Sequence, residues 1–146
     1  MNAKRLLDFL RQHRLAVEAS VSAQGGAQAA VVGIAVTDRF EIVFDTIDSS
    51  RKAVNLRRNP KLAFVIGGLI NGDERTVQYE GVADEPTGDE LERIKQVYYS
   101  VYPDGKSRLS WPGIMYVRVR PTWIRYSDYN LDPPQIVEFN SEQLVL

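Results

Sequence analysis

Two consecutive cations stand at the start of a short predicted helix, directly after a serine. Ser50 can cap this helix, which places Arg51 and Lys52 in its first turn. Cations are disfavoured there because the free amides of a helix start carry partial positive charge. A bound anion resolves the conflict, since free amides, a hydroxyl, a guanidinium and an ammonium together form a phosphate site. The segment by itself fits equally well a solvated basic helix that continues to Arg57 and Arg58.

The composition of the chain limits the other chemistry available. With 146 residues and a net charge of −1, the chain has no strong positive field for nucleic acid or an anionic membrane, so we expect neither as a partner. It contains no cysteine and a single histidine, which excludes thiolate chemistry and argues against a metal centre. There is no Ser-His-Asp arrangement, P-loop or dinucleotide fingerprint, so catalytic residues stay unassigned.

The chain shows no targeting or membrane signal. Asp8 interrupts the first apolar residues too early for a signal peptide, and no apolar run reaches the length of about 18 residues that a membrane span needs. We therefore expect a soluble, cytoplasmic protein.

Hydrophobic periodicity predicts the elements that position the basic segment. Apolar residues at helical spacing predict helices from Asn2 to His13 and from Asp89 to Tyr102. A period of two or a short apolar run predicts strands over residues 15–21, 27–37, 40–45, 61–70, 75–83, 114–120 and 122–129. The strand over 27–37 is nearly all apolar, which predicts that both of its faces are covered. This pattern favours a mainly β fold, an antiparallel barrel of six or seven strands with flanking helices.

The length of the chain and the apolar character of its last residues indicate the domain organisation. A length of 146 residues suits one domain, and no linker or repeat divides the chain, so we expect a single domain over residues 1–146. Residues 130–146 are too apolar for a solvated end. We expect this segment to be a tail that docks on its own domain or on a partner subunit.

The basic segment resembles the FMN-binding split barrels of the pyridoxamine 5′-phosphate oxidase-like family. In that family a strand ending in an aromatic residue, any residue and Thr is followed by Ser-Arg-Lys-Ala, Leu and Asn-Pro. The chain carries these motifs in the same order: Phe44-Asp45-Thr46, Ser50-Arg51-Lys52-Ala53, Leu56 and Asn59-Pro60. Residues 75–83 are similar to a later family strand that ends in Glu-Gly. The resemblance covers roughly Leu6 to Arg125 and implies a split barrel of the antiparallel, Greek-key type.

The resemblance also implies which residues bind the cofactor. It assigns eight candidate positions: Phe44, Asp45, Thr46, Ser50, Arg51, Lys52, Thr76 and Gln78. The basic pair binds the FMN phosphate, and the serine adds its hydroxyl. Thr46 and the backbone of the two residues before it lie against the edge of the flavin ring. Thr76 or Gln78 approaches from the neighbouring strand, where family members often place a Gln.

Two departures from the family pattern affect these expectations. Family oxidases usually carry a further phosphate-binding Arg sixteen residues before the position of Thr46, where this chain has Ala30. Arg57, Arg58 or Arg75 is a candidate to replace it. Oxidases of pyridoxamine phosphate also end in an Arg-rich strand that grips the substrate phosphate. This chain ends without such a strand, which argues against that activity.

The resemblance implies a flavin-dependent oxidoreductase that acts on an unknown small molecule, in which the flavin ring carries the redox chemistry. It also implies a homodimer with the cofactor at the interface, because a small barrel offers the flavin one wall only. Two alternatives stay open. In the first, the chain is a relative with the same fold that binds the deazaflavin coenzyme or haem. In the second, it is a non-catalytic flavin-binding or stress-associated dimer.

Overall fold

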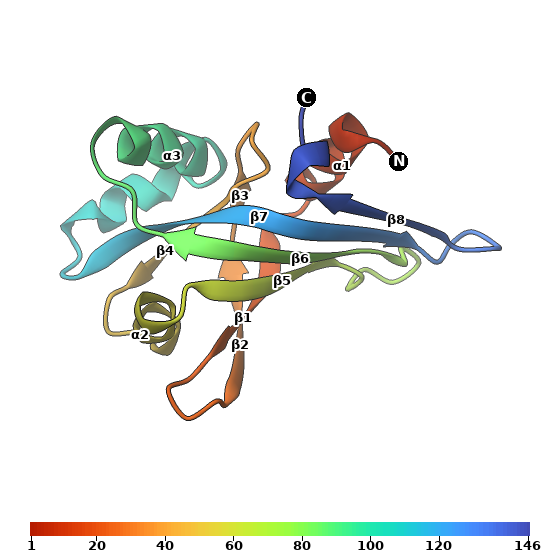
Figure 1. Cartoon of the computed structure of the whole chain (residues 1–146). Coiled ribbons are helices and arrows are strands. Elements are labelled where there is room, and N and C mark those ends of the chain that lie inside the picture. The colour runs from red at the N-terminus through yellow and green to blue at the C-terminus, as the bar shows by residue number, and fades with distance from the viewer.

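A computed structural model describes residues 1–146 as one curled antiparallel sheet with helices on its outside (Figure 1). The helices are α1 (Ala3–Arg11), α2 (Arg51–Arg58) and α3 (Gly88–Val101), with the 3-10 helices η1 (Pro103–Ser110) and η2 (Ser141–Gln143). The strands are β1 (Leu15–Val21), β2 (Ala27–Gly33), β3 (Ala35–Val36), β4 (Ile42–Ile47), β5 (Lys61–Gly67), β6 (Arg75–Asp84), β7 (Ile114–Asp128) and β8 (Gln135–Asn140). The predicted fold class, a mainly β split barrel with flanking helices, is confirmed.

The order of the strands explains why the sheet curls. It runs β2-β1-β5-β6-β7-β4-β3, so β2 and β3 stand at opposite ends. Only Ile34 separates these two strands in the chain. The sheet must therefore bend until its two ends approach each other, which produces an open barrel.

The barrel encloses an aromatic core. Phe44, Phe64 and Tyr79 are buried, and their rings meet edge to face at 6.1 Å and 5.7 Å. The Tyr79 hydroxyl lies 3.0 Å from the carbonyl oxygen of Phe40 and 2.9 Å from that of Val119. Because one carbonyl belongs to the connection between β3 and β4 and the other to β7, the hydroxyl helps to hold the curled barrel together.

Two helices cover parts of the barrel. The Asn2 side chain accepts a hydrogen bond from the Arg5 amide and caps α1, whose buried side chains join the main core: Leu6, Leu7, Phe9 and Leu10. On another face, α3 packs Ile94, Tyr98 and Tyr99 into a second, smaller cluster. No helix of the structure combines the length and the apolar character needed to cross a membrane.

The structure corrects one strand prediction near the C-terminus. The two strands predicted over 114–120 and 122–129 form a single strand, β7. It stays continuous across Pro121 because the register with β6 shifts between Glu80 and Gly81, which leaves Thr122 without a pairing partner. At such a bulge a proline does not interrupt the ladder of hydrogen bonds.

The burial of β2 also differs from the prediction. Its residues alternate between exposed and half-buried over most of the strand, and Val31 is 64% exposed. β2 pairs only with β1 and ends the strand order, so one edge and the outer face stay open. The apolar composition of this strand thus produces an exposed apolar surface in the single chain.

Backbone geometry shortens three predicted strands. The segment predicted as a strand over 27–37 breaks at Ile34, and β4 begins after Phe40, whose φ of 60° is not an extended conformation. β5 ends at Gly67, because Gly67 and Gly68 both have positive φ.

The last residues add a strand that the sequence did not predict. β8 pairs antiparallel with residues 123–128 of β7, while β4 pairs with residues 114–119 along the same edge of that strand. The segment from residue 130 therefore runs along its own sheet in this chain (Figure 1).

We predict that Gly81→Ala lowers the free energy of unfolding by about 1–3 kcal/mol. A Cβ at residue 81 would lie 2.6 Å from the carbonyl oxygen of Arg120, so the bulge would have to open. Urea unfolding measures the effect. Glu142→Ala, at an exposed position in η2, is the control and should change stability by less than about 0.5 kcal/mol. Equal stabilities for the two variants would contradict this account of the bulge.

Candidate functional site

The start of α2 is fixed to the end of β4 by two hydroxyl groups. The Ser50 hydroxyl accepts a hydrogen bond from the Ala53 amide at 3.2 Å and caps the helix. It also lies 2.9 Å from the Thr46 hydroxyl, at the end of β4. The predicted cap is therefore present, and Arg51 and Lys52 occupy the first turn of the helix.

A second contact fastens α2 to the strands opposite. Asn55 is 6% exposed, and its amide nitrogen donates to the Ser20 hydroxyl at 3.1 Å and to the Gln28 side-chain oxygen at 2.8 Å. Ser20 belongs to β1 and Gln28 to β2. One side chain thus sets the separation between the helix and two strands.

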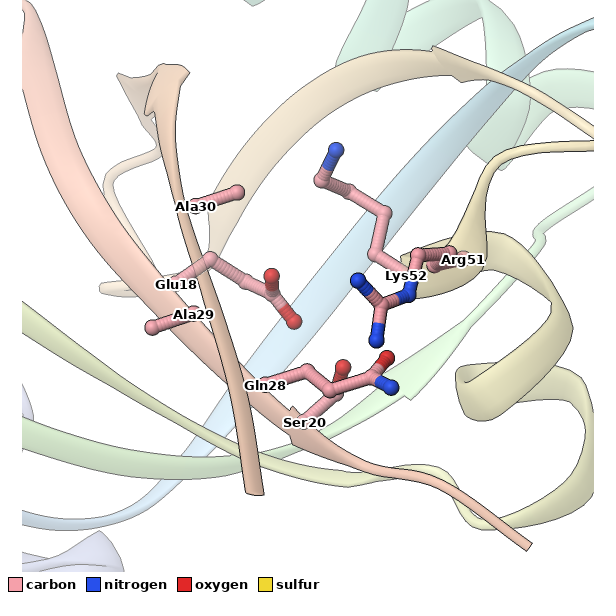
Figure 2. Close-up of a pocket in the computed structure, with 7 residues that line it drawn as sticks. All are labelled: Glu18, Ser20, Gln28, Ala29, Ala30, Arg51 and Lys52. Carbon is pink, nitrogen blue, oxygen red and sulfur yellow. The ribbon is translucent and has the colours of Figure 1, made fainter. Parts of the chain in front are cut away.

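A pocket of about 220 Å³ lies in the space that these contacts define. Seven residues line it, from β1, β2 and the start of α2: Glu18, Ser20, Gln28, Ala29, Ala30, Arg51 and Lys52. Figure 2 shows the two cations on the helix side of the pocket and the other five residues on the strand side. The sequence-predicted phosphate site and the position of the missing family Arg therefore meet in one pocket.

The cations of α2 divide into two pairs. Arg57 forms two hydrogen bonds with Glu85, each of 2.9 Å, and Arg58 donates to the Val21 carbonyl oxygen at 2.6 Å. By contrast, Arg51 and Lys52 take part in none of the ion pairs of the structure. The two cations at the positive end of the helix are thus the ones left available for an anion.

The pocket also contains a buried acid that the sequence analysis did not single out. Glu18 is 1% exposed, and its Oε1 atom has no hydrogen-bond partner. Burial raises the pKa of Glu18 above its usual value, against the opposing effects of the Ser20 hydroxyl and the Lys52 ammonium. No local signal marked it, because the larger apolar residues of β1, such as Leu15 and Val21, lie on its exposed face, and Glu18 shares the inward face with Ala16 and Ser20.

The end of β4 places two more of the predicted residues. Phe44 is fully buried in the core, so only its backbone is available to a ligand. The Asp45 carboxylate pairs with Arg108 at 2.9 Å and accepts a hydrogen bond from the Tyr98 hydroxyl at 2.9 Å. Burial, and next the charge of Asp45, raise the pKa of Tyr98. Asp45 therefore turns its side chain towards α3 and η1 and leaves its backbone at the end of β4.

The two predicted residues on β6 lie apart from this pocket in the single chain. Gln78 is exposed and lies opposite Val65 of the neighbouring strand β5. Thr76 is half-buried and lies opposite Gly67 of the same strand. Gln78 shares the outer face of the sheet with Val65, which is itself aligned with Val17 on β1. A role for Thr76 or Gln78 at the cofactor stays a prediction, and it requires a ligand that reaches this outer face.

None of the three arginines considered as replacements at Ala30 lines the pocket. Arg57 and Arg58 hold the contacts given above, on the far end of α2. Arg75 binds the Asp73 carboxylate through two side-chain hydrogen bonds of 2.8 Å and 2.7 Å. These hydrogen bonds lower the pKa of Asp73 to about 2. The arginine and lysine side chains that line this pocket are therefore Arg51 and Lys52.

Both the sequence and the fold of the chain are similar to those of known proteins. The sequence model of the family described as pyridoxamine 5′-phosphate oxidase matches residues 3–128. No curated protein matches the sequence significantly.

Three solved structures illustrate the range of proteins with this fold. A haem-binding protein from Mycobacterium smegmatis has a TM-score of 0.85 and 17% identity, with 99% of this chain and 60% of that protein covered. The haem storage protein of Vibrio cholerae has a TM-score of 0.69 and 16% identity, covering 83% and 91%. An FMN-binding, pyridoxamine 5′-phosphate oxidase-related protein from Nostoc punctiforme has a TM-score of 0.70 and 12% identity, covering 97% and 88%. At these identities the similarity concerns the fold alone.

We predict that Asn55→Ala lowers the free energy of unfolding by about 1–3 kcal/mol, because it leaves two polar side chains without their partner. Asn71→Ala, at an exposed position in a turn, is the control and should shift stability by less than about 0.5 kcal/mol. Thermal and urea unfolding check both. An Asn55→Ala protein as stable as its control would show that the helix is held in some other way.

Proposed function

The chain belongs to the pyridoxamine 5′-phosphate oxidase family, and from this premise we propose that it is a flavoprotein that binds the phosphate of FMN at the start of α2. The observation that carries the proposal is the pair of cations without ion-pair partners, Arg51 and Lys52, in a pocket at a capped helix start. Guanidinium, ammonium and free amide groups together supply the charge-assisted donors that a phosphate needs.

Different groups around the pocket are assigned to the phosphate and to the flavin ring of the cofactor. Arg51 and Lys52 neutralise the phosphate, and Ser50 presents the amides of the first helical turn to it. Thr46 and the backbone of the two residues before it lie next to Ser50 at the end of β4, and we assign them to the edge of the flavin ring. FMN, when bound, supplies hydride or electron transfer, so the protein has to position and shield it rather than provide a nucleophile.

We assign the protein to the flavin-dependent oxidoreductases, with a small molecule as substrate. The ionisable groups of the pocket are Glu18, Arg51 and Lys52, all on the phosphate side of this arrangement. The last strand, β8, contains no arginine with which to grip a substrate phosphate. A substrate without a phosphate group therefore fits this chain better than pyridoxamine phosphate.

Haem is the second candidate cofactor. Two of the structurally similar proteins are described as a haem-binding and a haem storage protein, and this chain lacks the further family Arg at Ala30. Parallel titrations with FMN, the deazaflavin coenzyme and haem distinguish the three cofactors, with FMN expected to bind most tightly. Preferential binding of haem or deazaflavin would replace the FMN proposal.

We also propose that the protein is a homodimer with the cofactor at its interface. Three valines on the outer side of β1, β2 and β5 are well exposed: Val21 by 38%, Val31 by 64% and Val65 by 45%. A mostly apolar hollow of about 560 Å³ lies on the same side, between β1, β2, β5 and β6. A second copy would bury this surface and bring the outer face that carries Gln78 into reach of the cofactor.

We predict that replacing Arg51 and Lys52 together by alanine weakens FMN binding by about a hundredfold or more, since two charge-assisted donors are lost. Riboflavin, which lacks the phosphate, should bind both proteins with the same affinity. Arg57→Ala with Arg58→Ala is the matched control on the same helix and should leave the affinity for FMN unchanged. Flavin fluorescence titration gives all the dissociation constants. Undiminished FMN binding by the first double variant would refute the phosphate site.

We predict that Val31→Glu converts the dimer to a monomer and weakens FMN binding about tenfold or more, because an unpaired charge would be buried at the interface. Val145→Glu tests the apolar C-terminal tail as the alternative interface; Val145 is 69% exposed. This variant should remain dimeric. Light scattering coupled to size exclusion measures the mass. A monomeric wild-type protein, or a monomer produced only by Val145→Glu, would contradict the proposed interface.

A further inference from the structure

A buried carboxylate faces the two cations that are proposed to bind the phosphate of FMN. Glu18 is 1% exposed, lines the pocket with Arg51 and Lys52, and leaves its Oε1 atom without a partner. Figure 2 shows its carboxylate directed into the space between β1 and the two cations. An unpaired buried carboxylate is costly, so a group that satisfies it on ligand binding is expected.

The surroundings of Glu18 contain few groups that could satisfy it. On β2 its cross-strand partner is Ala30, and on β5 it is Phe64, neither of which carries charge. The remaining pocket residues of β1 and β2 are uncharged. The charged groups that face it are therefore Arg51 and Lys52 of α2, and neither forms an ion pair with it.

The charge balance of the pocket changes when a phosphate enters. With Glu18 ionised, the two cations and the carboxylate give the pocket a net charge of +1. A phosphate monoester brings a charge of about −1.5 to −2 at pH 7. The phosphate and the carboxylate would then repel each other inside a small pocket, and both would compete for the same cations.

A single proton removes this repulsion. We propose that binding of the FMN phosphate is coupled to the uptake of one proton from solvent, which Glu18 and a phosphate oxygen then share in a hydrogen bond. The inference rests on the proposed FMN site and makes Glu18 the residue that ties phosphate affinity to pH. Burial already raises the pKa of Glu18 above its usual value in the free protein. The negative charge of the bound phosphate raises the pKa of Glu18 further.

The proposal fixes the direction of the pH dependence. A proton taken up on binding means that FMN affinity falls as pH rises, by about tenfold per pH unit where one full proton is bound. Between pH 7 and pH 8 the free phosphate is already mostly dianionic, since its second pKa is about 6. The fall in this range therefore reports on Glu18 and not on the free ligand.

The test is calorimetric titration of the full chain with FMN near pH 7.5, in two buffers of different ionisation enthalpy. The difference in apparent enthalpy counts the protons taken up. We expect close to one proton for the wild type and close to none for Glu18→Gln, whose amide donates a hydrogen bond without titrating. At pH 8, Glu18→Gln should bind FMN about tenfold more tightly than the wild type. Glu142→Gln makes the same change of charge at an exposed site outside the pocket and should match the wild type.

Riboflavin distinguishes failure of the inference from failure of the FMN site. Riboflavin should bind without proton uptake and with equal affinity to the wild type and Glu18→Gln. FMN binding to the wild type without proton uptake, or equal uptake by both proteins, overturns the role of Glu18 and leaves the FMN site standing. A wild type that binds no FMN overturns the site and the inference together. If Glu18→Gln does not fold, the proton counts of the wild type with FMN and with riboflavin decide the matter.

Discussion

The positive end of α2 is the constraint on which the proposed site depends. Two cations occupy the first helical turn, where the backbone amides already carry partial positive charge, and neither has an acidic partner. The chain has acidic partners for cations elsewhere: Arg57, on the same helix, is paired with Glu85. A pair of cations held in an unfavourable place is consistent with selection for an anion rather than for stability. The contacts of Ser50 and Asn55 serve this arrangement, because they fix the helix start against β4, β1 and β2.

The position of the pocket in the fold connects the proposed cofactor site with the proposed dimer interface. β1 and β2 form its strand side, and β2 is an edge strand whose outer face is open in this chain. The apolar outer face of the same strands continues beside the pocket. One copy of the chain therefore supplies the proposed phosphate site but only part of an enclosure for a ring system. In the proposed homodimer, assembly across this face would join two incomplete sites into two complete ones, as a two-fold axis allows.

Local sequence signals predicted much of the fold and the basic part of the site. The caps at Asn2 and Ser50, the alternation in β1 and the helical spacing in α3 depend on neighbouring residues, so they can be read without a structure. The continuity of β7 across Pro121 depends instead on a bulge beside Gly81 of another strand. The place of Glu18 in the pocket likewise depends on the register of β1 with β2 and on the docking of α2. Non-local pairing of this kind leaves only weak marks in a single sequence.

A crystal structure of the protein with FMN tests the central claim most directly. The account predicts the phosphate in the pocket between α2 and β1, within hydrogen-bond distance of Arg51 and Lys52, and with an oxygen next to Glu18. A phosphate located anywhere else on the chain, with this pair of cations free of it, would contradict the account.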